Sequence, residues 1–254
     1  MNRTISALLP AIGLCLLGTV HAQDAVPDAR WRIGASIGSG GAYRTLINTN
    51  GSELADRIID GRNEREEWDV AIGGGLYAAY RLSDRFSLEA GVAYARFGYG
   101  STVELSDLSF GDQIDPRRGF VYNTSDVPPA SWQLLDRFHY LEVPIGVVME
   151  LGQGRWRSST TLGVAPSFLL AAQGVTVSTY ADGREDRESF DLPGDHASFN
   201  LIPYFSTGVS MHPGGRWNWS LRPTFRYGAL KLIDTPVSAR LYSVTLDLGV
   251  QFTL

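Results

Sequence analysis

The sequence predicts an all-β protein, an antiparallel up-and-down transmembrane β-barrel of about eight strands. The first observation is the last stretch, Leu241 to Leu254, in which every second residue from Tyr242 onward is apolar or aromatic. Alternate side chains of a strand point to opposite faces, so this stretch has one apolar face. The second observation is that short and long connections alternate along the chain. The third is that no apolar run after residue 22 is long enough for a membrane helix, and a bilayer otherwise accepts only closed barrels.

The N-terminal residues 1–22 have the features of a secretory signal peptide. Arg3 supplies the positive charge, Ala7 to Leu17 the apolar run, and Val20 to Ala22 a cleavage site of small residues. The apolar run is too short for a spanning helix, so we expect it to be removed. Residues 23–30 are then a short periplasmic segment, and residues 31–254 form the barrel.

Charge and cysteine content exclude several classes of protein. The formal net charge of -5 and a pI near 5.4 argue against nucleic acid as a partner. The single cysteine, Cys15, lies within the signal peptide, and the bulky Leu14 before it argues against lipidation. The mature chain therefore has no disulfide, zinc–thiolate site or cysteine nucleophile.

Eight segments show strand periodicity, and we name them by their residues. The phase of the third slips near Arg96 to Tyr99, which suggests a bulge or the upper rim of the barrel. The fifth segment extends to Leu170 or on to Val177. The eight predicted strands are Trp31–Ala42, Trp68–Leu82, Phe86–Tyr99, Phe138–Leu151, Trp156–Leu170, Phe199–His212, Trp217–Leu230 and Leu241–Leu254.

The connections between these strands sort by length. The predicted turns at residues 83–85, 152–155 and 213–216 are tight, whereas loops cover residues 43–67, 101–136, 180–197 and 232–239. Outer-membrane barrels have an even number of strands, short periplasmic turns and longer extracellular loops. The sequence therefore predicts a bacterial outer-membrane location, with outer-membrane lipid as a partner and both termini on the periplasmic side.

Aromatic residues gather at the ends of the predicted strands. Two aromatic bands around an aliphatic zone are typical of a barrel that meets two membrane interfaces. The general preference of aromatic residues for strands is the alternative explanation. The residues assigned to these interface bands are Trp31, Trp68, Phe86, Trp156, Trp217, Trp219 and Tyr242.

The polar face of the strands is rich in small residues, which suits the narrow interior of an eight-stranded membrane barrel better than the outside of a soluble, lipocalin-like barrel. That soluble barrel remains the rival fold. Charges on this face are few and of both signs, which favours an internal ion-pair network that closes the bore. A narrow channel or transporter for small solutes is the alternative. The predicted luminal charges are Arg32, Arg81, Glu89, Glu142, Glu150, Arg157, Arg222, Arg226 and Asp247.

One strand resembles a known family. The run from Phe138 to Val147, FHYLEVPIGV, is similar to the "YLEIP" strand of the PorT-like outer-membrane β-barrel domain of Bacteroidetes. The resemblance covers about Trp31 to Leu254, and the small OmpA-, OmpX- and OmpW-like barrels share the architecture. It implies a partner in secretion or assembly, and recognition of the C-terminal strand by the barrel-insertion machinery. Leu254 replaces the usual terminal phenylalanine, with Phe252 two residues earlier.

Catalytic and metal-binding chemistry find little support in the sequence. His139 is expected to make an interface hydrogen bond and His212 to be solvated, while His196 lies beside Asp195 and Ser198. A catalytic triad is recognised by geometry rather than by nearness in sequence, so a lipid-modifying enzyme is the least favoured function. The acidic loop from Tyr180 lacks the ligand spacing of a calcium site. We expect no catalysis, no cofactor and no metal, and a structural or loop-mediated interaction role.

Overall fold

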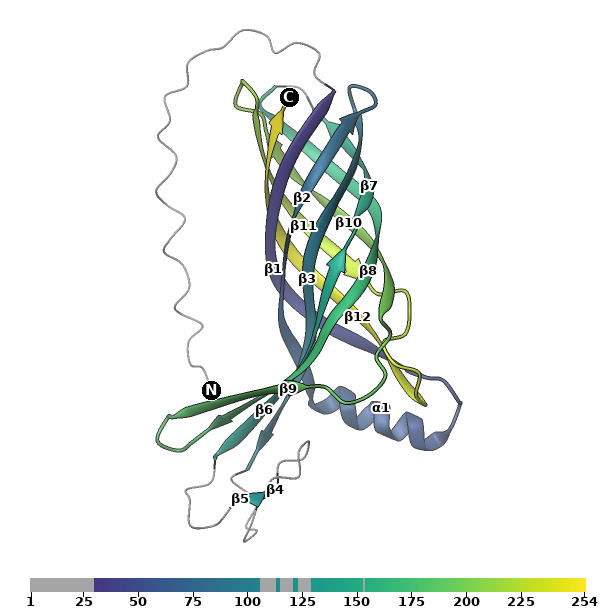
Figure 1. Cartoon of the computed structure of the whole chain (residues 1–254), viewed down its shortest axis with the longest axis vertical. Coiled ribbons are helices and arrows are strands. Elements are labelled where there is room, and N and C mark those ends of the chain that lie inside the picture. The colour runs from purple at the N-terminus through teal and green to yellow at the C-terminus, as the bar shows by residue number, and fades with distance from the viewer. Residues whose placement is uncertain (1–29, 106–112, 115–120, 123–128, 153) are drawn as a thin grey trace.

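The computed structural model describes residues 30–105, 113–114, 121–122, 129–152 and 154–254. The predicted signal peptide and most of the segment 23–30 lie outside them. The main feature is a closed antiparallel barrel (Figure 1). Its strands are β1 (Trp31–Asn48), β2 (Glu66–Arg81), β3 (Phe86–Glu104), β6 (Ser131–Glu142), β7 (Ile145–Leu151), β8 (Trp156–Thr179), β10 (Phe199–Met211), β11 (Trp217–Tyr227) and β12 (Val237–Thr253).

Pairing between the first and last strands closes the ring. β1 pairs with β2 on one side and with β12 on the other, where Arg32 faces Thr253. β6 and β7 share one position, because β3 and β8 pair with both. The described strands therefore make a ring of eight positions, which confirms the predicted all-β up-and-down barrel. No helix in the described part of the chain is long and apolar enough to cross a membrane.

The prediction of one strand over Phe138–Leu151 is wrong in two respects: the strand begins earlier, and it is divided into β6 and β7. Pairing begins at Ser131 and is interrupted at Val143 and Pro144. Proline has no N–H to donate to the ladder, so strands break or bulge where it occurs. The Pro144 carbonyl still accepts from the N–H of Gly91 at 3.0 Å, which holds the broken strand against β3.

Two predicted loops are largely regular structure, at the end of the barrel opposite the tight turns. We call this end the loop end and the other the turn end. The segment 43–67 contains the end of β1 and helix α1 (Glu53–Arg65), and the segment 180–197 contains β9 (Glu185–Asp191), which pairs with β8. Within the mostly undescribed loop 101–136, β4 (Gln113–Ile114) pairs with β5 (Val121–Tyr122). α1 lies across the loop end (Figure 1).

Helix α1 is stabilised by its ends rather than by a buried face. Ser52 is the N-cap, and its side-chain oxygen accepts from the N–H of Ala55 at 3.2 Å. Acidic residues lie in the first turn and basic residues in the last, which suits the helix dipole. Ala55 is its buried residue, so the sequence carries no amphipathic pattern to reveal it.

Apolar side chains cover the outside of the barrel. Leu76, Ile37 and Leu162 are 70, 69 and 68% exposed, whereas the inward-facing Thr161 and Ser167 are fully buried. The aromatic residues assigned to the interfaces lie on this outer surface. Trp31, Trp68, Phe86, Trp156, Trp217 and Trp219 are exposed, and Tyr242 is half-buried with its ring edge-on to Trp68 at 5.3 Å.

The bulge suggested by the change of phase in the third strand lies in the neighbouring strand β2. β3 keeps its alternation, and the extra residue is in β2, where Trp68 and Ile72 pair with Tyr99 and Arg96. Phe97 remains on the inner face and is 2% exposed. The apparent slip arises because the interior of the barrel itself becomes apolar at this level.

Candidate functional site: a charged bore and its mouth

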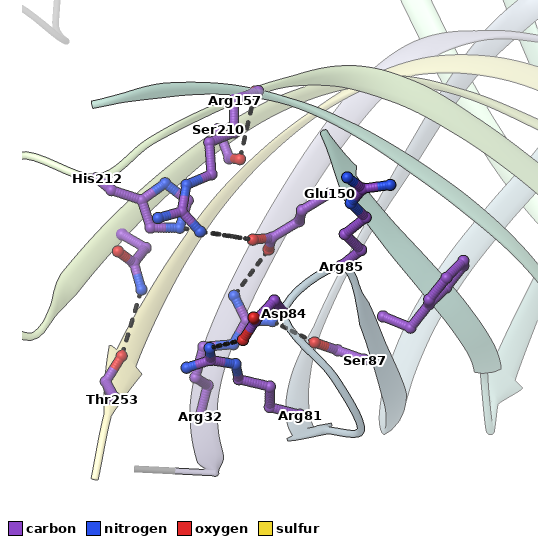
Figure 2. A network of polar contacts seen from close by, with 12 residues as sticks. Arg32, Arg81, Asp84, Arg85, Ser87, Glu150, Arg157, Ser210, His212 and Thr253 are labelled. Atoms are coloured by element: carbon purple, nitrogen blue, oxygen red, sulfur yellow. Dashed lines mark hydrogen bonds and ion pairs between the residues drawn. The ribbon is translucent and has the colours of Figure 1, made fainter. Parts of the chain in front are cut away.

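The predicted luminal charges fall into two groups along the bore, the first at the turn end. Arg32 of β1 donates from Nη1 to Oε1 of Glu150 in β7 at 2.8 Å, and from Nη2 to Ser87 in β3 at 2.7 Å (Figure 2). β1 and β7 are not neighbours in the ring, so the ion pair crosses the bore. Arg32 therefore ties three strands together at the mouth.

Glu150 is shared by several basic groups (Figure 2). Arg157 Nη1 lies 3.5 Å and His212 Nε2 3.8 Å from its second oxygen. Burial lowers the pKa of His212, and although Glu150 opposes this, Arg157 and Arg32 lower it further. We therefore expect a neutral His212 at pH 7, which leaves Glu150 facing two guanidinium groups.

A cavity of about 370 Å³ occupies the mouth among these residues. Arg85 also lines it. Arg81 lines the same cavity at its rim and pairs with Asp84 at 2.5 Å (Figure 2). The mouth is an open, basic hollow with a single buried carboxylate, which suits a small anion or water better than an apolar ligand.

The second group of charges closes the middle of the bore, and Asp247 of β12 is its centre. One carboxylate oxygen accepts from Thr224 at 2.7 Å and lies 3.4 Å from Arg226, and the other accepts from Thr245 at 2.8 Å. A Cβ on Gly38 would lie 1.9 Å from this carboxylate. Glycine at position 38 therefore makes the room that Asp247 occupies.

Glu89 and Glu142 complete this middle layer from the other side of the bore. Glu89 lies 3.6 Å from Arg222 and accepts from Gln251 at 3.1 Å. Glu142 is 2% exposed and interacts electrostatically with Arg226. The remaining cavity measures about 30 Å³, which is room for about one water molecule.

An apolar layer lies in the bore between the charged layer and the loop end. Phe97 and Tyr140 are 2 and 1% exposed, with their rings edge-on at 5.8 Å. The buried residues of this layer are Ala42, Ala71, Ala95, Phe97, Tyr99, Phe138, Tyr140, Ala165, Ile202, Leu232, Ala239 and Leu241. The sequence prediction missed it, although aromatic residues on the otherwise polar face of β3 and β6 were a visible signal.

An ion-pair cluster fastens α1 over this layer. Arg44 of β1 donates to Glu66 and to Asn63, each at 2.6 Å, and Arg62 donates to Glu66 at 2.5 Å. Burial acts to lower the pKa of Arg62, but its hydrogen bond and ion pair with Glu66 raise it above the usual value. The helix is thus held to β1 and β2 by ion pairs and hydrogen bonds.

The sequence matches, over residues 21–227, a family model described as an outer membrane protein β-barrel domain. The chain belongs to this family. Outer-membrane barrels have short periplasmic turns and longer extracellular loops, so we expect the turn end to be periplasmic and the loop end extracellular. The family description is broader than the PorT-like group, and that finer resemblance stays a prediction.

Several solved structures align with most of this chain at low sequence identity. The Neisserial surface protein A aligns at 12% identity and a TM-score of 0.40, over 88% of this chain and 97% of that one. Ail of Yersinia pestis aligns at 13% and 0.36, over 88% and 99%. The N-terminal barrel domain of OprF of Pseudomonas aeruginosa aligns at 10% and 0.30, over 86% and 96%. At such TM-scores the likenesses carry no argument. Comparison with curated protein sequences finds no match.

The histidines considered for chemistry lie apart from the bore charges, except His212. His139 is on the outer surface, where Nδ1 lies 2.6 Å from the hydroxyl of Tyr94. His196 packs against Phe138 at 5.5 Å between ring centroids, and no hydrogen bond joins it to Asp195 or Ser198 in the described structure. Among the described residues, no group of three His, Asp or Glu is placed to hold a metal ion.

Proposed function

We propose that this protein is a closed outer-membrane barrel that acts through its extracellular surface, without catalysis and without passing solutes. The observation that carries the proposal is the double closure of the bore. A charged layer fills the middle, and an apolar layer lies between it and the extracellular end. A solute would have to separate buried ion pairs and then displace packed aromatic rings.

The extracellular end offers ordered structure that suits partner binding. α1 exposes Leu54 and Ile58, at 68 and 44%, one turn apart on the same helix face. The hairpin of β8 and β9 also lies at this end and carries exposed Glu185, Asp186 and Glu188. An exposed apolar pair and an acidic hairpin at the same end suit a protein partner that has both an apolar groove and a basic surface.

Planar-bilayer recordings test the closure. We expect no conductance steps from the wild-type protein, and none from Arg222→Ala, because the apolar layer still blocks the bore. Sustained conductance that increases in Arg222→Ala would instead support the narrow channel.

Site-specific photo-cross-linking in cells tests the extracellular role. A photoreactive residue at position 54 is expected to capture a partner, whereas the same residue at the exposed position Glu64 serves as the control. Equal capture from both positions, or none from either, would contradict recognition through the apolar pair.

We also propose that residues 1–22 are removed on export and that the insertion machinery recognises the C-terminal strand. Mass spectrometry of the outer-membrane protein should then show a chain that begins at Gln23. A chain that retains Met1 in the outer membrane would contradict cleavage. Phe252→Ser is expected to lower the amount of inserted protein more than Thr253→Ala does.

A further inference from the structure

A basic cluster lies on the outer surface of the barrel, separate from the bore. Arg96 of β3 and His139 of β6 are direct cross-strand partners, so their side chains share one face. Tyr94 lies two residues before Arg96 on the same face and bonds His139. The next pair along the strands includes Arg137, which makes a two-point ion pair with Asp69 at 2.8 and 3.1 Å.

Arg96 makes no direct ion pair in the described structure, although Asp69 interacts with it electrostatically. The described structure contains no carboxylate within 4 Å of its guanidinium, and Nη2 donates to the carbonyl of Val70 at 3.0 Å. Its Nε is buried without a hydrogen-bond partner among the described residues. Because Asp69 already pairs with Arg137, the cluster keeps an uncompensated positive charge on the lipid-facing side of the barrel.

The height of this charge places it at one membrane surface. Arg96 follows Phe86, at the periplasmic end of β3, by ten residues. At a rise of ~3.3 Å per residue and a strand tilt of ~40°, this is about 25 Å, roughly the height of the apolar band of an outer-membrane barrel. Arg96 therefore lies at the outer boundary of the hydrocarbon, where phosphates of outer-leaflet lipids lie.

An apolar hollow of about 580 Å³ runs from this cluster over the outer surface. Ile37, Ile72, Gly74, Tyr94, Leu246 and Leu248 line it. Gly74 pairs with Tyr94, and Ile72 with Arg96, so the hollow ends directly beside the charge. Its depth comes from Gly74, which contributes no side chain to a surface otherwise covered by aliphatic groups.

We propose that this is a binding site for a phosphorylated, multiply acylated lipid of the outer leaflet, of the lipid A type. A phosphate accepts hydrogen bonds from the guanidinium of Arg96, and one acyl chain lies in the hollow. A guanidinium suits phosphate because it donates two parallel hydrogen bonds. The combination of an unpaired cation at the outer boundary and an adjoining apolar hollow matches an anionic head group joined to hydrocarbon chains.

Native mass spectrometry of the folded full-length barrel in detergent, titrated with lipid A, tests this site. We expect Arg96→Gln to weaken lipid A binding about tenfold. The matched control is Arg216→Gln, the same change in a periplasmic turn, which should bind as the wild type does. Unboiled gel mobility shows which variants are folded. Equal binding by folded Arg96→Gln and wild type would overturn the proposal.

A second variant tests the hollow without touching the charge. Ser39 is exposed in the hollow, so Ser39→Leu fills it and leaves Arg96 in place. We expect weaker lipid A binding in this variant as well. Lipid A without phosphate should bind the wild type as weakly as lipid A binds Arg96→Gln. Phosphatidylglycerol that binds as tightly as lipid A, with the same dependence on Arg96, would overturn the assignment to an outer-leaflet glycolipid.

Discussion

The two layers that close the bore occupy the same faces of the same strands but rely on different interactions. In the charged layer, Asp247 pairs with Arg226 of the neighbouring strand β11, and Glu89 pairs with Arg222 across the bore. In the apolar layer, the inner positions of β3 and β6 carry Phe97 and Tyr140. The charged layer depends on every partner being present, since an unpaired buried charge is costly. The apolar layer depends on filled volume, so it tolerates small changes of shape.

The largest expected effect is in the charged layer. Asp247→Ala leaves Arg226, Thr224 and Thr245 without their shared acceptor and should lower the free energy of unfolding by about 3–5 kcal/mol. Urea unfolding in lipid vesicles, followed by tryptophan fluorescence, measures it. The double variant Asp247→Asn/Arg226→Gln should recover part of the loss. A loss under about 1 kcal/mol would show that Asp247 behaves like a solvated surface ion.

A smaller effect is expected from Thr224→Val, which keeps the shape of the side chain and removes the hydroxyl that donates to Asp247 at 2.7 Å. A hydrogen bond to a charged group contributes about 1.5–3 kcal/mol. The same unfolding measurement should show a loss in that range. No change would place the hydroxyl outside the network.

The apolar layer should be destabilised more by a polar substitution than by an apolar one of similar size. Ile202 is 2% exposed, and Ile202→Val should lower the free energy of unfolding by only about 0.5–1.5 kcal/mol. Ile202→Thr introduces a side chain of nearly the same shape as valine. It should lower the free energy of unfolding more than Ile202→Val does, because its hydroxyl is buried among apolar side chains. Equal effects of the two variants would mean that water enters this layer.

The smallest effect on the barrel is expected from Ser52→Ala. The loss of the N-cap should destabilise α1 by about 1 kcal/mol. Hydrogen exchange should quicken in the first turn of the helix while the urea midpoint of the barrel stays unchanged. A shift of that midpoint would mean that α1 and the barrel unfold together.

The sequence predicts the turn end of this molecule better than the loop end. Alternation and turn spacing define the ring and its inner face, because a barrel wall in lipid must be apolar outside. Phe97 and Tyr99 keep the alternation of β3. They are apolar residues on the inner face because the interior of the barrel is itself apolar at their level. Helix α1 is stabilised by the N-cap Ser52 and by a hydrogen bond from Arg44 of β1. Local sequence periodicity does not predict such contacts. Which charges pair across the bore depends on the closure of the ring, so the local sequence does not predict that Arg32 pairs with Glu150.

The most direct test of the double closure is the accessibility of single cysteines to a small, membrane-impermeant thiol reagent, in a Cys15→Ser background of the barrel in vesicles. Asn218→Cys lies in the periplasmic mouth, Ser206→Cys beside the charged layer and Ala165→Cys in the apolar layer. The closed bore predicts modification of Asn218→Cys from the periplasmic face and protection of the other two from both faces. Modification of Ser206→Cys and Ala165→Cys at the rate of Asn218→Cys would contradict closure and show a continuous aqueous path.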